Sequence, residues 1–142
     1  MSPMPIDSID SIMDFAPDDL DRPFWEGCQR GEFLLQRCPR SGRWQWPAGA
    51  DPETGSDLEW LPASGRGTIH TFTIIHKVFR PEFAERVPYN VIVVELEEGP
   101  FFHSNLIGCE NSEIRVGMPV EVVFDKLDGD ITLPRFRLRN DR

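Results

Sequence analysis

The chain has 142 residues, which is the length of one domain or of one domain with a small appendage. It carries 15 lysines and arginines against 24 aspartates and glutamates, for a net charge of −9. That charge argues against a general nucleic-acid binder, which presents a basic face, and against binding to anionic membrane surfaces. No apolar run approaches the roughly 20 residues that cross a bilayer. The three cysteines are odd in number and widely spaced, so we expect free thiols in a reducing cytoplasm.

An acidic leader occupies residues 1–20, and we expect it to be partly disordered because no basic residue offsets its aspartates. It lacks the basic and continuous apolar segments of a signal peptide. A short helix is predicted next. Asp21 suits its N-cap, Pro23 its first turn and Gly31 its C-terminal end.

The predicted helix has an apolar side formed by Phe24, Trp25 and Cys28. We expect this side to pack on the rest of the domain, and docking to a partner is the alternative interpretation. Residues 33–38 are then predicted to form a short strand, and residues 39–57 are polar and rich in turn formers. Such a segment cannot bury a core of its own and usually depends on a metal or a neighbouring unit.

Residues 61–142 are predicted to be all β. Alternating apolar and polar residues, bounded by turn-forming residues, predict strands over residues 68–79, 91–97, 101–107, 120–125 and 131–138. Five strands without a long helix between them favour a five-stranded OB-fold barrel, so the predicted class is mainly β. Gly65 and Gly67, just before the first of these strands, predict a bulge or a sharp bend.

Several motifs in a fixed order carry a family resemblance. They lie at residues 31–38, 58–60, 64–69, 88–89, 93–100 and 117–122. Over about residues 20–138 the chain resembles the acyl-CoA-associated OB-fold proteins that have an N-terminal rubredoxin-like zinc ribbon. The resemblance implies a helix and a ribbon in residues 21–60, followed by an OB-fold barrel in residues 61–142. It also implies a partner protein of thiolase-like enzymes in acyl-CoA chemistry.

The ribbon of this family has two Cys-x-x-Cys motifs, and the present chain departs from both. The first motif keeps Cys38 but has Ser41 in its second position, and Asp51 and Thr54 stand where the cysteines of the second would be. A structural zinc ion needs four strong ligands, and hydroxyl groups are poor ones. We therefore predict that the ribbon fold persists without zinc. Packing in its place is expected from three tryptophans: Trp44, Trp46 and Trp60.

No catalytic site is predicted from the sequence. His70 and His76 lie on one predicted strand, too far apart to share a ligand shell, and His103 lies on another. Ser64 stands beside glycines but outside the Gly-x-Ser-x-Gly pattern of a nucleophile elbow. Cys109 has no adjacent histidine or aspartate and is expected to be a buried small residue.

Two basic segments interrupt the acidic background, one near residues 76–86 and one at the C-terminal end. Because coenzyme A carries a phosphorylated nucleotide, a protein that binds it presents cations and a stacking surface. The resemblance implies a coenzyme A thioester as ligand, and no bound cofactor is expected. The predicted contact residues are Arg80, Phe83, Arg86, Arg135 and Arg137. The alternative, at least as well supported by the sequence, is that these arginines pair with surface carboxylates.

The leading hypothesis is a non-catalytic accessory subunit that associates with a thiolase-superfamily enzyme and helps to bind acyl-CoA. Aromatic residues often anchor protein interfaces. The candidates here are Phe24, Trp25, Trp44, Trp46 and Phe79. One alternative is a single-stranded nucleic-acid-binding OB-fold protein, which the net charge disfavours. Another is a stand-alone acyl-CoA-processing enzyme, for which no nucleophile, base and orienting group are apparent. The sequence leaves open whether the chain is a monomer or a homodimer.

Overall fold

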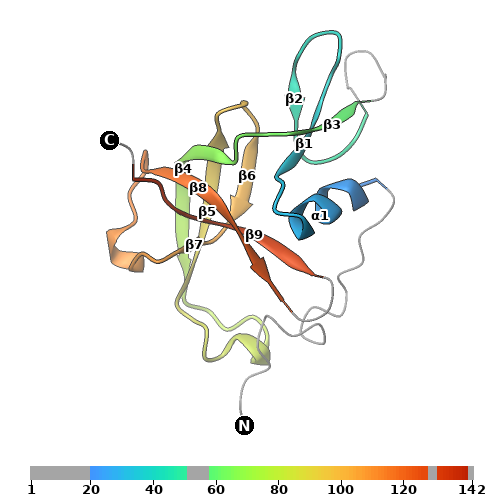
Figure 1. Ribbon diagram of the computed structural model, residues 1–142. Helices are drawn as coiled ribbons and strands as arrows, with labels where there is room; N and C mark the ends of the chain where they lie inside the picture. The colour runs from blue at the N-terminus through green and yellow to red at the C-terminus, as the bar shows by residue number, and fades with distance from the viewer. Residues whose placement is uncertain (1–19, 51–57, 128–130, 141–142) are drawn as a thin grey trace.

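The computed structural model describes residues 20–50, 58–127 and 131–140, so the predicted leader lies outside the described residues except for Leu20. The described chain is mainly β, as predicted, with a short helix, a small sheet and a larger sheet (Figure 1). The helix and the small sheet are α1 (Arg22–Gln29), β1 (Leu34–Arg37), β2 (Trp44–Gln45) and β3 (Glu59–Pro62). The larger sheet contains β4 (Arg66–Ile75), β5 (Tyr89–Leu96), β6 (Phe101–Ser104), β7 (Leu106–Ile107), β8 (Pro119–Lys126) and β9 (Thr132–Leu138). Two short 3-10 helices are η2 (Pro81–Phe83) and η3 (Asn111–Glu113).

The small sheet is the sheet of the predicted ribbon. Its strand order is β2-β1-β3, and both pairs are antiparallel. Gln36 of β1 is buried, and its Oε1 accepts a hydrogen bond from the Gly49 amide at 2.8 Å. Three half-buried tryptophans pack against the hydrophobic core: Trp44, Trp46 and Trp60. The three tryptophans therefore pack as expected, and the absence of zinc from the ribbon stays a prediction.

The larger sheet closes into the predicted barrel. Its strand order is β6-β5-β4-β8-β9-β7, and β6 and β7 are successive pieces of one segment separated by Asn105. β6 pairs antiparallel with β5, whereas β7 pairs parallel with β9, so this segment joins the two ends of the sheet. The single strand predicted over residues 101–107 is therefore corrected to two short strands. The segment changes partner at Asn105, whose Nδ2 donates a hydrogen bond to the Asn90 carbonyl oxygen.

Helix α1 packs on the domain, as expected, against β1, β8 and β9. Phe24 has no exposed area, and its ring centroid lies 5.9 Å from those of Phe33 and Phe102. Asp21 occupies the N-cap position, but its side chain makes no capping hydrogen bond, which corrects the prediction. The Asp21 carbonyl oxygen instead accepts a hydrogen bond from the Phe24 amide at 3.0 Å. The helix is held by core burial more than by its cap.

Two glycines connect the ribbon to the barrel where side chains would not fit. Gly65 has a φ of +73°, and a Cβ at this position would lie 2.5 Å from Val122 Cγ1. A Cβ at Gly67 would lie 2.6 Å from Val94 Cγ1. The predicted bend is thus present at Gly65, whereas the bulge of β4 comes later, after Ile69.

Strand β4 ends at Ile75, four residues before the predicted end. The last pair of the ladder joins Ile75 to Tyr89, and the next residue on the partner side is Pro88, which has no amide hydrogen to donate. Residues 76–80 therefore leave the sheet and are exposed, including Val78 and Phe79.

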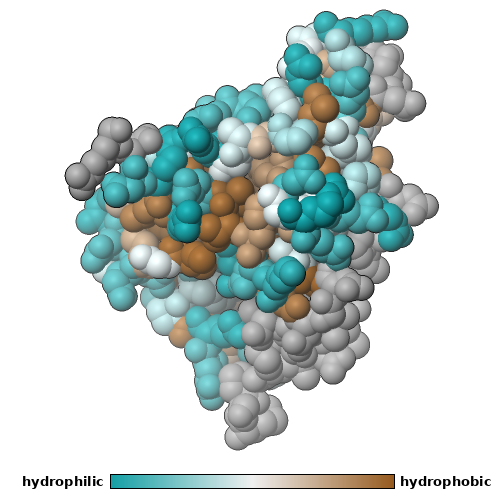
Figure 2. Space-filling model, in the orientation of Figure 1, coloured by the Kyte–Doolittle hydropathy of each residue, from teal (hydrophilic) through white to brown (hydrophobic). Residues whose placement is uncertain are grey.

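On the face shown in Figure 2, hydrophobic residues gather over the barrel and hydrophilic residues surround them. Large apolar residues that remain exposed in the described chain include Phe79, Phe101, Val116 and Leu138. No helix of the described residues has the length and apolar character needed to cross a membrane.

Candidate functional site

The first degenerate zinc motif forms a tight hydrogen-bonded turn. The Gly42 amide donates to the Cys38 carbonyl oxygen at 2.8 Å, and the Cys38 amide donates to the Arg43 carbonyl oxygen at 2.8 Å. Ser41 Oγ accepts a hydrogen bond from the Arg43 amide at 3.2 Å. Backbone hydrogen bonds and a serine hydroxyl therefore hold this turn.

The donor groups of the two motifs do not fit a structural zinc ion. Cys38 is buried, whereas Ser41 is exposed and offers a hydroxyl. Asp51 and Thr54 lie outside the described residues. Within residues 20–50, 58–127 and 131–140, no group of three His, Cys, Asp or Glu side chains is placed to hold a metal ion. One thiolate, one carboxylate and two hydroxyls are a weak ligand set for zinc, so a ribbon without zinc stays our prediction.

A pocket of about 500 Å³, which we call the loop pocket, lies between residues 83–90 and strands β7 and β9. Phe83, Arg86 and Arg135 all line it, so the fold brings together three of the five predicted ligand contacts. Tyr89 lines it as well, and the Phe83 and Tyr89 ring centroids are 6.3 Å apart. Glu85 lines it too, so the loop pocket combines two guanidinium groups and one carboxylate with two aromatic rings. Guanidinium groups can pair with phosphate oxygens, and the rings offer a stacking surface.

Asparagine side chains form a polar wall of the loop pocket, and the sequence analysis missed them. Asn90 Nδ2 donates to the Leu106 carbonyl oxygen at 2.9 Å and to Asn111 Oδ1 at 3.1 Å. Asn90 Oδ1 accepts a hydrogen bond from the Leu106 amide at 2.7 Å. The sequence signal for this wall was Asn90. It is polar, yet the alternation of β5 places it on the same inward side as Ile92 and Val94.

Arg135 is largely buried at the edge of the loop pocket. Its side chain is 18% exposed, and its Nη1 lies 3.1 Å from Asp125 Oδ2. Its Nε is buried and has no hydrogen-bond partner among the described residues. This Nε has almost no accessible surface, so its unpaired hydrogen costs stability and is not itself a contact point for a ligand.

Arg80 and Arg137 do not line the loop pocket. Arg80 Nε lies 3.1 Å from Glu82 Oε2, and Arg137 Nη2 lies 2.7 Å from Glu121 Oε2. Both arginine side chains are more than half exposed. These two cations make the surface ion pairs that were the alternative interpretation, and the fold separates them from the other three predicted contacts.

A larger cleft of about 1030 Å³, which we call the aromatic cleft, lies between the ribbon and the turn that joins β5 to β6. Trp44 and Trp46 line it from the ribbon, and Phe101 and His103 line it from β6. The rings of Phe101 and His70 are 4.7 Å apart, and Phe101 is 46% exposed. The sequence analysis missed Phe101, although its outward position in β6, next to the buried Phe102, was the available signal.

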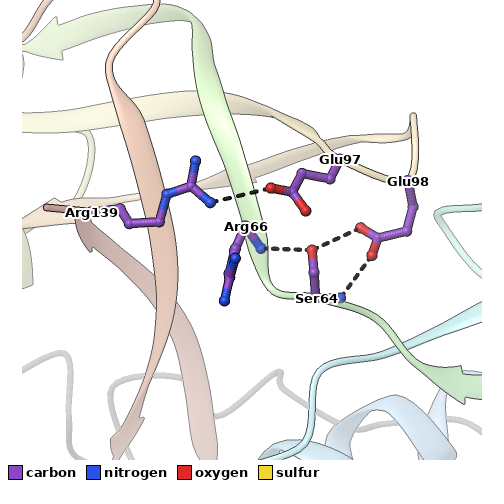
Figure 3. A network of polar contacts seen from close by, with 5 residues as sticks. All are labelled: Ser64, Arg66, Glu97, Glu98 and Arg139. Atoms are coloured by element: carbon purple, nitrogen blue, oxygen red, sulfur yellow. Dashed lines mark hydrogen bonds and ion pairs between the residues drawn. The ribbon is translucent and has the colours of Figure 1, made fainter. Parts of the chain in front are cut away.

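A polar network fastens the ribbon linker to the β5–β6 turn and so fixes one wall of the aromatic cleft (Figure 3). Ser64 donates to the Glu98 carboxylate through its amide at 2.7 Å and through its hydroxyl at 3.3 Å. Ser64 Oγ also accepts a hydrogen bond from the Arg66 amide at 3.1 Å. Arg139 Nη1 donates to Glu97 Oε1 at 3.2 Å, which ties the end of the chain to the same turn.

The five predicted partner contacts differ in exposure. Phe24 is fully buried by the chain itself, so its assignment to a partner interface was wrong. Trp25, Trp44 and Trp46 are half-buried and pack against the core, and a partner role for them stays a prediction. Phe79 is 63% exposed, and Lys77 Nζ lies 5.2 Å from its ring centroid.

The nucleophilic side chains of the described chain lack the partners of a catalytic site. The Ser64 hydroxyl is bonded to Glu98 and to a backbone amide, as described above. Burial raises the pKa of Cys28 to about 12. Cys109 is half-buried rather than buried as predicted, and partial desolvation, helped by Glu113 and Glu110, raises the pKa of its thiol. Both thiols therefore stay protonated near neutral pH and are weak nucleophiles.

Two family models match the chain, one for each unit. The model for the rubredoxin-like zinc ribbon domain of ChsH2 matches residues 25–57, and the model for the C-terminal OB-fold domain of ChsH2 matches residues 60–125. Among solved structures, a chain of the Ltp2-ChsH2(DUF35) aldolase is similar, with a TM-score of 0.79 and 31% identity over 87% of this chain and 98% of that chain. A DUF35-family protein of unknown function from Sulfolobus solfataricus shares the fold alone, with a TM-score of 0.57 and 13% identity.

Two kinds of curated protein are similar in sequence to this chain. A probable enoyl-CoA hydratase alpha subunit of Thermomonospora curvata is 34% identical over 82% of this chain, which spans 37% of that subunit. A DUF35 domain-containing scaffold protein of Methanothermobacter thermautotrophicus is 41% identical over 49% of this chain and 52% of its own length. The chain thus spans little more than a third of the hydratase subunit and about half of the scaffold protein.

Proposed function

Since this chain belongs to the DUF35 family of ChsH2-type proteins, in which a rubredoxin-like zinc ribbon precedes an OB-fold domain, we propose that it is a non-catalytic accessory subunit that associates with a thiolase-superfamily enzyme and helps to bind acyl-CoA. Relatives described as scaffold proteins support the accessory role. The solved aldolase, named for Ltp2 together with a ChsH2 DUF35 chain, supports association with an enzyme subunit.

The observation that carries the ligand part of this proposal is the composition of the loop pocket. Arg86 and Arg135 supply charge for phosphate oxygens, and the Phe83 and Tyr89 rings offer a stacking surface. Ser64 is hydrogen-bonded and the thiols of Cys28 and Cys109 are held protonated, which suits a binding role better than a catalytic one. The acidic chain as a whole repels nucleic acid, so two arginines in one pocket favour a small anionic ligand over a polynucleotide.

Co-purification tests the partner role. The full chain is tagged, expressed in its own host and purified beside a tag-only control, and the eluted proteins are identified by mass spectrometry. We expect a thiolase-type protein in about stoichiometric amount, with acyl-CoA activity in the complex and none in the isolated chain. Recovery of the chain alone, or with nucleic acid and no protein, would contradict the proposal.

Calorimetric titration with coenzyme A tests the ligand role on the chain and on its complex. Replacing either pocket arginine, Arg86→Ala or Arg135→Ala, should weaken the affinity about tenfold, because each removes a charge-assisted contact. Arg137→Ala is the matched control, since it removes an arginine of the same strand outside the pocket and should leave the affinity unchanged. Equal affinities for all four proteins would remove the loop pocket from the proposal.

A further inference from the structure

A third pocket adjoins both the loop pocket and the aromatic cleft. This middle pocket of about 370 Å³ shares Trp46 and His103 with the aromatic cleft, and it shares Asn105 and Arg135 with the loop pocket. The three hollows therefore follow one another along β6 and β7, from Phe101 to Ile107. We call this series the β6–β7 groove.

The two ends of the β6–β7 groove differ in chemistry. The loop pocket has the cations Arg86 and Arg135, together with asparagine amides. The aromatic cleft has the large rings of Trp44, Trp46 and Phe101. Seven residues of extended chain separate the ends by about 20 Å. One ligand that occupies the whole groove must therefore be elongated, with an anionic head and an apolar tail.

We propose that an acyl-CoA lies along the β6–β7 groove with its phosphorylated nucleotide in the loop pocket, its pantetheine arm across the middle pocket and its acyl group in the aromatic cleft. This assignment rests on the proposed function, namely that the chain binds acyl-CoA. It adds the direction in which the ligand lies along the groove. The ribbon, through Trp44 and Trp46, contacts the acyl end of the ligand.

Charge and apolar burial favour this direction. The loop pocket is lined by two arginines and one carboxylate, that of Glu85, whereas the aromatic cleft is lined by Arg43 and Glu98. The loop pocket is therefore the more cationic end, and phosphate groups are better placed there. The apolar chain is better placed among rings, where burial of its methylenes is favourable. His103 and Asn105, at the junctions between hollows, offer polar groups to the amides of the pantetheine arm.

Titration with two probes, coenzyme A and octanoyl-CoA, tests the direction on the full chain and on its complex. We expect the wild type to bind octanoyl-CoA about tenfold more tightly than coenzyme A, since the acyl chain adds apolar burial. Phe101→Ala should remove most of that difference and leave coenzyme A affinity unchanged, because Phe101 is exposed and contributes to the cleft alone. Arg86→Ala should weaken the affinity for both probes by the same factor. Val116→Ala, an equally conservative change at a residue 65% exposed outside the groove, is the control.

The outcomes separate the direction from the proposed function. If neither probe binds the chain or its complex, the ligand part of the proposed function fails and the direction fails with it. If both probes bind, but Phe101→Ala lowers the two affinities equally or leaves both unchanged, the direction is overturned while the proposed function stands. If Arg86→Ala reduces the affinity for octanoyl-CoA alone, the ligand lies the other way round. Trp44→Ala provides a second cleft variant should Phe101→Ala lower the melting temperature.

Discussion

Cys28 lies on the inner side of α1 with 1% of its surface exposed, in the same core as Phe24 and Phe33. Burial raises the pKa of its thiol to about 12, because a thiolate there would lose its hydration. In the unfolded chain the thiol ionises near its ordinary value of 9.0. The native state therefore holds a proton that the unfolded state releases, and this difference makes stability depend on pH.

The contribution of Cys28 to stability is present below pH 9.0 and is lost as pH rises toward 12. We expect the free energy of unfolding to fall more steeply between about pH 8 and about pH 10.5 in the wild type than in Cys28→Ala. Urea denaturation of both proteins at the two pH values gives the change in the free energy of unfolding with pH for each. Titrating groups common to both proteins contribute equally and cancel in the comparison. Parallel slopes would show that the thiol ionises alike in both states.

Gly67, like Gly65, is a glycine at which a side chain would not fit. A Cβ there would meet the Glu95 carbonyl oxygen and Val94 Cγ1 across the β4–β5 ladder. We expect Gly67→Ala to lower the free energy of unfolding by about 2 kcal/mol, because the backbone of β5 must shift. Gly49→Ala is the matched control, since the nearest atom to its Cβ is the flexible end of Gln45. Equal denaturation midpoints for the two variants would refute the packing argument.

At the scale of elements, the ribbon is the unit for which we predict a zinc-ribbon fold without zinc. Its sheet β2-β1-β3 and its first turn are formed by backbone hydrogen bonds, and three tryptophans pack against the core. Cysteines at the lost positions would complete four thiolates with Cys38, the strongest ligand set for structural zinc. Restoring these cysteines therefore tests whether the ribbon still brings the four ligand positions together.

Ser41→Cys, Asp51→Cys and Thr54→Cys combined should take up about one zinc ion per chain, whereas the wild type should hold none. Elemental analysis of the purified proteins measures both, and adding Cys38→Ala to the triple variant should abolish the uptake. Stoichiometric zinc in the wild type would contradict the loss of the site. A triple variant that stays free of zinc would show that the ribbon no longer brings these positions together.

The loop after β4 is the second element with a consequence for function. Residues 76–80 carry Lys77 and Arg80 and no acidic residue, in a chain whose net charge is −9. Backbone hydrogen bonds within residues 80–87 order the chain that follows Phe79. Binding a partner through Phe79 would therefore cost little additional conformational entropy. Arg80 is paired with Glu82, so Lys77 is the cation that lies at the Phe79 ring. An exposed aromatic ring beside a lysine suits an apolar partner pocket with an acidic rim.

Phe79→Asp should reduce recovery of the co-purified thiolase-type partner at least about tenfold, because it removes an aromatic anchor and adds charge. Val116→Asp places the same charge at an equally exposed apolar residue on another loop and should leave recovery unchanged. Circular dichroism of both variants checks that the barrel is intact. If both variants retain the partner equally, Phe79 is no anchor.

At the scale of the whole molecule, local patterns predicted most of the barrel strands but not which strands pair. The alternation of Ile92, Val94 and Leu96 predicted β5, because a period of two is a property of one strand. The apolar run at residues 101–107 predicted one strand, but closure of the barrel divides it between β5 and β9. Val78 and Phe79 extended the predicted first strand, although the structure exposes both. Pairing depends on residues far away in the chain, which no local window contains.

The candidate site was also predicted in part. Composition and motif spacing indicated the ribbon, the barrel and the missing zinc ligands, because ligand types and strand periods are properties of short segments. The sequence also supplied the five candidate ligand contacts. The tertiary structure alone decided that Phe83, Arg86 and Arg135 meet in one pocket, that Arg137 pairs with Glu121 on the neighbouring strand, and that Phe24 is buried. The pocket depends on how β6 and β7 close the barrel, and closure is set by packing between residues distant in sequence.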